Sequence, residues 1–415
     1  NYYYSFLRAT MLLGLAAHDE LPATNGWLTE FHDTKLMGEL VPTFDMDLVG
    51  GGSREGTGYG VSMKNLWELY DMWHGSTGEV IATKKKHTRA SMLSFIHQTL
   101  PTLDRFAPIG DQSRDSTASV FDYHRQYLQE LVSLFPQDPL APRAQALLAA
   151  SSVPKMTQQF EYVYDFLYEN ADVAPTSLDG LGTAYYAPGI GELYARSGWD
   201  THATWINLIA GPYTQSHAHQ DQGSLMIYKD GWLAYDPVID SHSGLTQDVD
   251  AHGLVRIDDG GPLAQKTGTA SAMLALHRGD GWLHAAADIT PVYKGKVGKV
   301  QREIVYIEPD ALVVYDRVTS SASQSQIWSL AFPAQPSING TETSVQASGH
   351  TLTIQRVTPS SGPNASVHSY ADDSDFSGGF RLDEQMPGGD QRWLHVIWID
   401  TAVTNITAHD DHTVD

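Results

Sequence analysis

The spacing of apolar residues changes once along this chain of 415 residues, and that change constrains the fold more than any other feature. From position 2 to about 168, apolar residues recur at helical spacing, as in Leu66, Leu69, Tyr70 and Trp73. Beyond about position 191, short runs rich in β-branched and aromatic residues alternate with turn residues. The chain is therefore expected to fold as a helical half followed by a half built of strands.

The segment between the two halves is rich in glycine and proline, which mark loops and linkers. We predict a helical domain over 1–170, a linker over 171–190 and an antiparallel β-sandwich over 191–415. Two domains also fit the length, because a single hydrophobic core rarely grows beyond about 250–300 residues. The clearest strand predictions cover 224–228, 232–235, 254–257, 303–307, 311–315, 351–357 and 393–399. Many short strands separated by turns favour a sandwich or barrel over alternating βαβ units.

The charge balance limits the partners that the protein can have. Lys and Arg number 26 against 49 Asp and Glu, which leaves a formal net charge of −23. This charge argues against nucleic acid or an anionic membrane as a partner, although a few cations in a cleft can still hold an anionic polysaccharide. No apolar run approaches the roughly 18 residues of a membrane span. Because the chain has no cysteine, any bound metal must rest on histidine and carboxylate side chains.

The densest polar cluster is Ser-His-Ala-His-Gln-Asp-Gln-Gly-Ser at 216–224. If this segment is extended, His217, His219 and Asp221 project from one face, because side chains alternate across a strand. A His-x-His pair on a strand commonly supplies two nitrogen ligands to one metal, while a chance surface pair is the alternative.

Two later residues add to this cluster. Asp236 ends a predicted strand, and a hairpin turn at 229–231 can return it beside the start of the preceding strand. His252 precedes a further predicted strand. We therefore predict that His219, Asp236 and His252 converge as two nitrogens and one oxygen, a set that suits a divalent metal and above all Zn²⁺. A turn residue before proline and a strand-edge histidine are the alternative interpretations of Asp236 and His252.

Several motifs occur in an order that resembles the heparinase II/III-like polysaccharide lyases, a group that includes heparin and heparan lyases and certain alginate lyases. The motifs lie at 51–59, 109–111, 194–200, 216–225, 233–237 and 251–258. The resemblance implies an α+β protein with an (α/α) toroid followed by an antiparallel β-sandwich that carries the metal. Family members usually have further helices before this point, so the toroid is expected to be incomplete here.

The resemblance implies cleavage of a uronic-acid-containing anionic polysaccharide by β-elimination. Such an enzyme must neutralise the uronate carboxylate, remove the proton from C5 and protonate the leaving glycosidic oxygen. The family motif places Tyr59 as the acid, and as the base too where both protons lie on one face of the sugar, with His217 beside it. A tyrosine phenolate needs nearby positive charge, which His217, Arg54 or the metal can supply. A packed tyrosine after a glycine turn is the alternative for Tyr59.

Substrate-binding residues are predicted from the same resemblance. Arg54 and Glu55 stand in the motif that presents the tyrosine, and we expect them in the cleft. The family holds the substrate carboxylate with an Asn-His pair; Asn1 matches the asparagine, but tyrosine follows it instead of histidine. His242 is a candidate for a relocated histidine. We expect the metal to organise the cleft wall, with Asp221 orienting an imidazole.

Two other functions stay open at this point. A glycoside hydrolase could use two carboxylates from the set Asp45, Asp47, Glu55 and Asp111. A noncatalytic polysaccharide-binding protein with structural zinc is the second alternative, and an ultraviolet-absorbing unsaturated product would separate a lyase from both.

Location and assembly follow only indirectly from the sequence. The chain starts at Asn1 without a methionine, so we expect that an upstream segment was removed or is not included. We infer a periplasmic or secreted location from the function that the resemblance implies. A homo-oligomer is compatible with the sequence, which does not specify the uronan.

Overall fold

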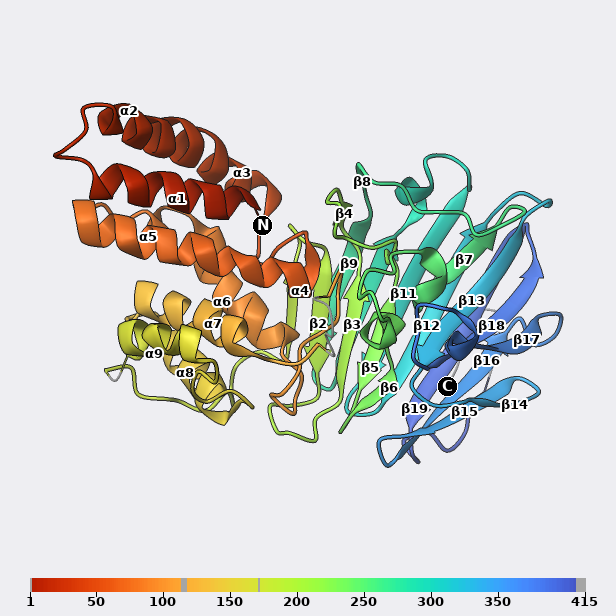
Figure 1. Cartoon of the computed structure of the whole chain (residues 1–415). Coiled ribbons are helices and arrows are strands. Elements are labelled where there is room, and N and C mark those ends of the chain that lie inside the picture. The colour runs from red at the N-terminus through yellow and green to blue at the C-terminus, as the bar shows by residue number, and fades with distance from the viewer. Residues whose placement is uncertain (1, 113–117, 171, 408–415) are drawn as a thin grey trace.

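Helices fill the first part of the chain and antiparallel sheets fill the second, in a computed structural model that describes residues 2–112, 118–170 and 172–407 (Figure 1). The two parts lie side by side, and α1 begins near their junction. The predicted α+β class, with helices before strands, is therefore confirmed. The (α/α) toroid, expected to be incomplete here, remains a prediction.

The helical part consists of α-helices joined by short 3₁₀ turns and one π-helical segment, η1. Its elements are α1 (Tyr2–Ala16), α2 (Thr24–Thr29), η1 (Glu30–Leu40), α3 (Val41–Asp47), α4 (Gly56–Gly60), η2 (Val61–Met63), α5 (Lys64–Thr77), η3 (Ala82–Lys84), α6 (Lys86–Gln98), α7 (Asp122–Leu134), α8 (Ala141–Ala150), η4 (Gln159–Glu161) and α9 (Tyr162–Tyr168). Apolar faces at helical spacing form its core, where Trp67 of α5 and Leu128 of α7 are fully buried. Among the helices described, none is long and apolar enough to cross a membrane.

The second part is built of strands joined by turns and short 3₁₀ segments. Its elements are β1 (Ala184–Ala187), β2 (Glu192–Arg196), β3 (Trp205–Ile209), β4 (Pro212–Tyr213), β5 (Leu225–Tyr228), β6 (Trp232–Ala234), η5 (Pro237–Asp240), η6 (Val249–Ala251), β7 (Val255–Asp258), β8 (Thr269–Ala270), β9 (Ala272–Gly279), β10 (Trp282–Asp288), η7 (Thr290–Tyr293), β11 (Lys299–Ile307), β12 (Ala311–Thr319), β13 (Ser325–Phe332), β14 (Ser337–Asn339), β15 (Glu342–Ala347), β16 (His350–Thr358), β17 (Asn364–Ser369), η8 (Tyr370–Asp372), β18 (Phe380–Pro387) and β19 (Asp390–Ile399). All seven segments predicted as strands overlap a strand.

The strands form layered antiparallel sheets around a shared core. The largest sheet has eight strands in the order β14-β15-β16-β19-β12-β11-β10-β9, and a five-stranded sheet runs β1-β2-β3-β5-β6. A four-stranded sheet, β17-β18-β13-β7, completes the layers. Leu208, Ile304 and Leu330, one from each sheet, belong to the same buried cluster. Burial alternates along β11 and β12, so one face of the large sheet packs on the core.

The predicted linker needs a correction at its second end. Helix α9 ends at Tyr168, close to the predicted boundary, but β1 lies inside 171–190 and pairs with β2 from Ala184 opposite Ala195. The sheets therefore begin at Ala184 rather than at 191. Glycines and prolines flank this short strand on both sides, and they obscured its four residues in the sequence.

A buried arginine fixes the sheets to the end of α6. The guanidinium of Arg196 on β2 donates to the carbonyls of His97, at 3.0 Å, and Thr99, at 2.7 Å. The indole of Trp205 donates to the same His97 carbonyl at 3.1 Å. The last carbonyls of a helix lack partners within it and favour a cation. This contact sets the position of the sheets relative to the helices.

A second buried arginine connects two loops of the sheets, one at Gly223 and one at Gly253. Arg302 on β11 forms a bidentate pair with Asp316 on β12, at 2.7 and 3.0 Å. Its remaining nitrogen donates to the carbonyl oxygens of Gly223, at 2.6 Å, and Gly253, at 2.8 Å. Both charged side chains are buried, so each needs the opposite charge of the other to offset its loss of hydration.

We predict that Arg302→Met destabilises the sheets by about 3–5 kcal/mol, because Asp316 keeps a buried charge and two loop carbonyls lose their donor. Urea unfolding followed by tryptophan fluorescence measures the loss. Arg317→Met is the matched control on β12, since the Arg317 pair with Glu303 is partly exposed and should be worth less than about 1 kcal/mol. Equal unfolding midpoints for the two variants would contradict the assignment, and Asp316→Leu added to Arg302→Met should restore part of the loss.

Candidate active site and metal centre

The loop that presents Tyr59 is held by close backbone contacts with the segment before Asp111. Thr57 donates its backbone N–H to the carbonyl of Ile109 at 2.8 Å, and its hydroxyl accepts from the Ile109 N–H at 3.1 Å. Gly56 has φ +82°, and a Cβ there would lie 2.0 Å from the Ile109 carbonyl oxygen. Only glycine fits this position, so the glycine-rich sequence around Tyr59 has a direct structural cause.

Tyr59 and His217 come together from the two parts of the chain. Tyr59 lies on α4, and His217 lies in the turn before β5. Their rings stack with centroids 4.1 Å apart and an interplanar angle of 11°. His217 keeps 29% of its side chain exposed. The predicted proximity of the two residues is therefore met, while their catalytic roles stay predictions.

The carboxylate of Asp111 contacts both histidines of the His-x-His motif. One oxygen lies 2.7 Å from Nδ1 of His217, and the other lies 2.9 Å from Nε2 of His219. Gln247 donates to the second oxygen at 2.9 Å. The Asp111 backbone N–H also donates to the His217 carbonyl at 2.8 Å. At Gly110, with φ +69°, a Cβ would lie 2.8 Å from that same carbonyl.

The charge of Asp111 decides which ring nitrogens carry protons. Burial favours the neutral acid, but the hydrogen bonds from His219, His217 and Gln247 outweigh it and hold the pKa of Asp111 below its ordinary value. An ionised carboxylate can only accept hydrogen bonds. Nδ1 of His217 and Nε2 of His219 are therefore the N–H donors. In the neutral imidazoles, the lone pairs lie on Nε2 of His217 and Nδ1 of His219.

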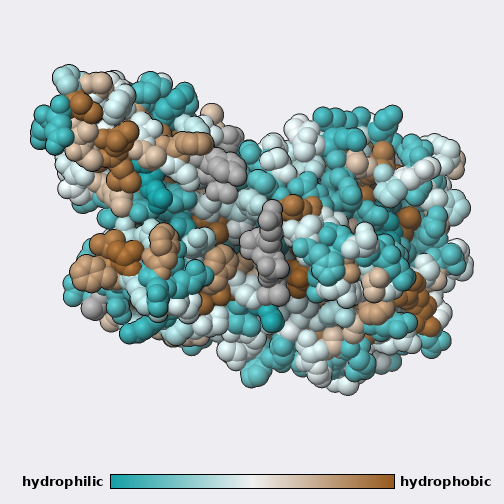
Figure 2. Space-filling view, in the orientation of Figure 1, coloured by the Kyte–Doolittle hydropathy of each residue, from teal (hydrophilic) through white to brown (hydrophobic). Residues whose placement is uncertain are grey.

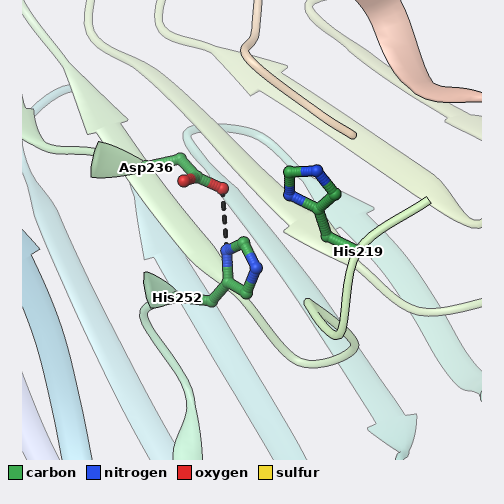
Figure 3. Close-up of side chains that lie close together, drawn as sticks. All are labelled: His219, Asp236 and His252. Carbon is green, nitrogen blue, oxygen red and sulfur yellow. Dashed lines mark hydrogen bonds and ion pairs between the residues drawn. The ribbon is translucent and has the colours of Figure 1, made fainter. Parts of the chain in front are cut away.

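The three predicted metal ligands converge. Figure 3 shows His219, Asp236 and His252 facing one another, and their ligand atoms all lie within 4.8 Å of each other. All three side chains are buried, and Nδ1 of His252 lies 2.8 Å from a carboxylate oxygen of Asp236. Asp236 also accepts the Val238 backbone N–H at 3.0 Å, which fixes the direction of its carboxylate.

The unpaired atoms of this group fit a metal ion. Nδ1 of His219 and Nε2 of His252 are buried, and neither has a hydrogen-bond partner among the described residues. Buried polar nitrogens without partners are rare in proteins. Burial acts to lower the pKa of His252, but the carboxylates of Asp236 and Asp221 raise this pKa overall. The surroundings of His252 therefore favour a positive charge. Two unpaired imidazole nitrogens beside a carboxylate match the ligands that Zn²⁺ prefers.

The local structure of the ligands differs from the prediction in two ways. The segment 216–224 is a turn-rich loop that ends where β5 begins, so His217, His219 and Asp221 do not alternate along a strand. The ligands also do not come from three neighbouring strands, because β7 belongs to another sheet than β5 and β6. Instead, each ligand lies in a connection next to a strand end. The two layers meet there, and Arg302 holds the loops together.

A cavity of about 430 Å³ lies at the junction of the two parts. Its lining residues are Tyr3, Tyr4, Glu39, Leu40, Thr43, Phe44, Leu48, Ser53, Arg54, Glu55 and Gln215. Arg54 and Glu55 both line this cavity, and their contact with a substrate stays a prediction. Arg54 also donates to the Gly189 carbonyl at 2.8 Å. We call this space the junction cavity.

The other predicted substrate-binding residues are Asn1 and His242, and neither is among the described residues that line the junction cavity. Asn1 lies outside the described residues, as do the side chains of Asp45 and Asp47. His242 is exposed in the loop that precedes Gln247, where its backbone N–H donates to the Asp375 carbonyl at 2.6 Å. His242 does not line the junction cavity. Its proposed contact with the substrate stays a prediction.

Two residues of this site were not predicted in their present role. The sequence places Asp111 in the motif at 109–111 and among the carboxylates open to a hydrolase, yet both of its oxygens accept from side chains of the site. Gln247 had not been singled out at all. Its position between two ligands, Asp236 and His252, was the only signal in the sequence that could have pointed to it.

Neither a comparison with models of protein families nor one with curated proteins finds a match. Solved structures do match. A structure of heparinase III has a TM-score of 0.73 at 13% identity, over 97% of this chain and 62% of the other. Heparan sulfate lyase HepC from Pedobacter heparinus gives 0.70 at 13%, over 97% and 60%. The chondroitin AC lyase of Streptomyces coelicolor A3, in complex with chondroitin sulphate, gives 0.52 at 10%, over 91% and 59%.

The likeness covers nearly all of this chain but a smaller share of its structural relatives. The chain spans about 60% of the length of the heparan sulfate lyase. At this level of identity, the likeness establishes the fold. By its fold, the chain groups with the heparinase III structures, in agreement with the resemblance of its sequence motifs.

Proposed function

We propose that the protein is a polysaccharide lyase that cleaves a uronic-acid-containing polysaccharide by β-elimination. The observation that carries this proposal is the stacking of the Tyr59 and His217 rings, with the Asp111 carboxylate hydrogen-bonded to Nδ1 of His217. This arrangement offers a proton-transferring hydroxyl and an oriented imidazole. Glu55 and Gln215, which lie a few residues from Tyr59 and His217 in the sequence, line the junction cavity. Structural relatives that are named as heparan sulfate and chondroitin lyases support the same reaction class.

The elimination needs one base and one acid. A base takes the proton from C5 of the uronate, the electron pair of that bond forms the double bond between C4 and C5, and the bond from C4 to the glycosidic oxygen breaks. Tyr59 donates its hydroxyl proton to the departing oxygen. Where both events occur on one face of the sugar, Tyr59 in phenolate form first takes the C5 proton and then passes that proton to the departing glycosidic oxygen. Otherwise, Nε2 of His217 is the base, since Asp111 occupies Nδ1.

The enzyme must also neutralise the uronate carboxylate, because C5–H becomes acidic enough only when the developing negative charge is stabilised. Arg54 is a cation in the lining of the junction cavity. Its Nε donates to the Gly189 carbonyl, and this hydrogen bond restricts the orientation of the guanidinium. We assign the binding of the substrate carboxylate to Arg54, and Asn1 and His242 are further candidates for this role. An uronan of low charge density fits a protein whose formal net charge is −23.

We further propose that His219, Asp236 and His252 hold a divalent metal, with Zn²⁺ as the best fit. When bound, the ion would cross-link the loops next to β5, β6 and β7 and supply positive charge near His217. Asp111 would then be the carboxylate that orients a ligand imidazole, an arrangement common around zinc. The expected substrate is extracellular, which is why we keep a periplasmic or secreted location as part of the proposal.

A hydrolase built on Asp111 has less support. An acid or base of a glycoside hydrolase needs a carboxyl group that can reach the glycosidic oxygen or a water molecule. Asp111 is buried, and its two oxygens are occupied by His217, His219 and Gln247.

The first prediction concerns Tyr59. Tyr59→Phe should lower turnover roughly 10²-fold or more, because the proton-transferring hydroxyl is lost while the ring still packs on His217. The ultraviolet absorbance of the unsaturated product, measured over a panel of alginate, heparosan, heparan sulfate, hyaluronan and chondroitin, gives the rate. Exposed Tyr162→Phe is the matched control and should act like the wild type. Near-normal turnover by Tyr59→Phe would show that another group is the acid.

The second prediction concerns Asp111. Asp111→Asn keeps the shape of the side chain, but its amide can no longer accept from both imidazoles. We expect kcat to fall with little change in KM, and the affinity for Zn²⁺ to weaken by about 10- to 100-fold, the usual effect of losing such an orienting carboxylate. Competition with a chromophoric chelator measures the affinity independently of turnover. Exposed Asp248→Asn serves as the control. Unchanged zinc affinity and unchanged kcat together would refute this role.

The third prediction concerns the metal itself. Free Zn²⁺ at about 100 times its Kd should stabilise the protein by about 2.7 kcal/mol, because the unfolded chain lacks the site. Chelation should lower the melting temperature, and His252→Ala should have a similarly low melting temperature that no longer responds to the chelator. His18→Ala, which replaces an exposed histidine on the helical side, is the control. Purified protein without metal, and a melting temperature indifferent to zinc, would contradict the proposal.

A further inference from the structure

We propose that Asp375 is a positioning residue for the reaction, because its carboxylate fixes a loop that holds Asp111 in place. The inference rests on the proposed lyase function. The loop covers residues 241–247, between η5 and η6, and we call it the Gln247 loop. Asp375 lies far away in the sequence, in the connection between η8 and β18.

The Gln247 loop has almost no apolar anchor. Its one apolar side chain is that of Leu245, which keeps 45% of its surface exposed. Hydrophilic residues also cover much of the surrounding surface of the sheets (Figure 2). A loop that buries so little apolar surface gains little from the hydrophobic effect to offset the entropy of ordering its backbone. Polar contacts must therefore determine its conformation.

The carboxylate of Asp375 accepts four hydrogen bonds from this loop. One oxygen accepts from the hydroxyls of Ser241, at 2.5 Å, Ser243, at 2.8 Å, and Thr246, at 2.5 Å. The other oxygen accepts the backbone N–H of Ser243 at 3.0 Å. Burial favours the neutral acid, but these hydrogen bonds outweigh it and lower the pKa of Asp375 to about 2. An ionised acceptor makes such bonds stronger than a neutral one does.

Backbone contacts align the same two segments. The His242 N–H donates to the Asp375 carbonyl at 2.6 Å, and the Ser377 N–H donates to the Asp240 carbonyl at 2.8 Å. These bonds do not depend on the side chain of Asp375. Replacing its carboxylate should therefore loosen the Gln247 loop without separating the two segments.

The far end of the Gln247 loop contacts the candidate site. The amide of Gln247 donates to the Asp111 carboxylate at 2.9 Å. The Gly244 carbonyl accepts the backbone N–H of Gln112 at 3.0 Å, and the Gln247 carbonyl accepts that of Gln220 at 3.0 Å. The loop thus joins the segment of Asp111 to the segment that carries the two histidines.

Asp375 is therefore linked to the reacting groups by direct contacts. It orders the loop, the loop donates to Asp111, and Asp111 bonds to His217, which stacks on Tyr59. Asp375 itself contacts neither His217 nor Tyr59, so its effect on the reaction must pass through the loop. Small displacements of a proton-transferring group are costly, because a misplacement of about 1 Å can lower a rate roughly 10²-fold.

Kinetics of Asp375→Ala give the first test. We expect kcat to fall roughly tenfold with KM within about twofold, since the variant misplaces Asp111 and His217 and leaves the cavity lining unchanged. Thr246→Val removes one donor to the carboxylate, keeps the shape of its side chain and should give a smaller fall in kcat. The matched control is Asp372→Ala, an exposed aspartate at the end of η8. Unfolding midpoints check that each variant folds. A raised KM with unchanged kcat would overturn the inference.

A double-mutant cycle tests the route through the loop. Gln247→Met removes the amide that donates to Asp111 and keeps the length of the side chain. If Asp375 acts through this amide, the variant with both changes should lose much less kcat than the product of the two single losses. A loss equal to that product would show that the two residues act independently, and it would refute the proposed route.

Hydrogen exchange gives a readout that is independent of turnover. The amides of Gln112 and Gln220 donate to carbonyls of the Gln247 loop, so they report on its position. Asp375→Ala should reduce the protection of both amides, while the amides of β3 keep theirs and Asp372→Ala changes neither set. Mass spectrometry of peptides that contain these residues measures the exchange.

The outcomes separate this inference from the proposed function. If no uronan yields an unsaturated product, the lyase proposal fails, and lost protection at Gln112 and Gln220 would still support the positioning of Asp111 by Asp375. If the wild type cleaves a uronan but Asp375→Ala matches Asp372→Ala in kcat, the inference is wrong. Unchanged exchange at both amides would overturn it whatever the kinetics.

Discussion

The arrangement of the candidate site depends on one buried carboxylate, that of Asp111. Its backbone belongs to the helical part, while its two oxygens accept from histidines that precede a strand of the sheets. One of these histidines stacks on Tyr59, and the other faces Asp236 and His252. Because an ionised carboxylate only accepts hydrogen bonds, Asp111 fixes the tautomer of both rings at once. The same charge that orients the proposed catalytic imidazole therefore also prepares a nitrogen for the proposed metal.

This carboxylate can act only because the sheets hold the loops that contact it. Arg302 crosses from β11 to the carbonyls of Gly223 and Gly253, which lie between the histidine loops and the strands that follow them. Arg196 and Trp205 bind the end of α6 and so set the distance between helices and sheets. Burying an arginine is unfavourable unless its charge and its donors find partners. Arg302 donates to the Asp316 carboxylate and to two backbone carbonyls, and Arg196 donates to two backbone carbonyls, so both side chains connect separate segments around the site.

Much of this structure could be predicted from the sequence, and the part that could not has a physical cause. Helices and strands follow from local spacing, so the change of pattern near position 170 located the two parts. The convergence of His219, Asp236 and His252 could be predicted because each lies near the end of a strand with a clear apolar pattern. The loop at 216–224 could not, because its conformation depends on contacts with Asp111 and Arg302, which are far away in the sequence. The role of Gln247 was missed for the same reason, since its partner Asp111 is far away in the sequence. Strand β1 was missed because glycines and prolines flank its four residues.

The central claim is that this site breaks a glycosidic bond by elimination, and the mass of the products tests it most directly. An elimination adds no water, so the masses of the two products sum to the mass of the starting oligosaccharide, and one product carries a double bond. Hydrolysis adds one water molecule to that sum. Mass spectrometry of a uronate tetrasaccharide digested by the wild-type protein should give a product lighter than the hydrolytic one by one water. The Tyr59→Phe protein should give roughly 10²-fold less of this product in the same time. Products that contain the added water, or equal yields from both proteins, would contradict the account.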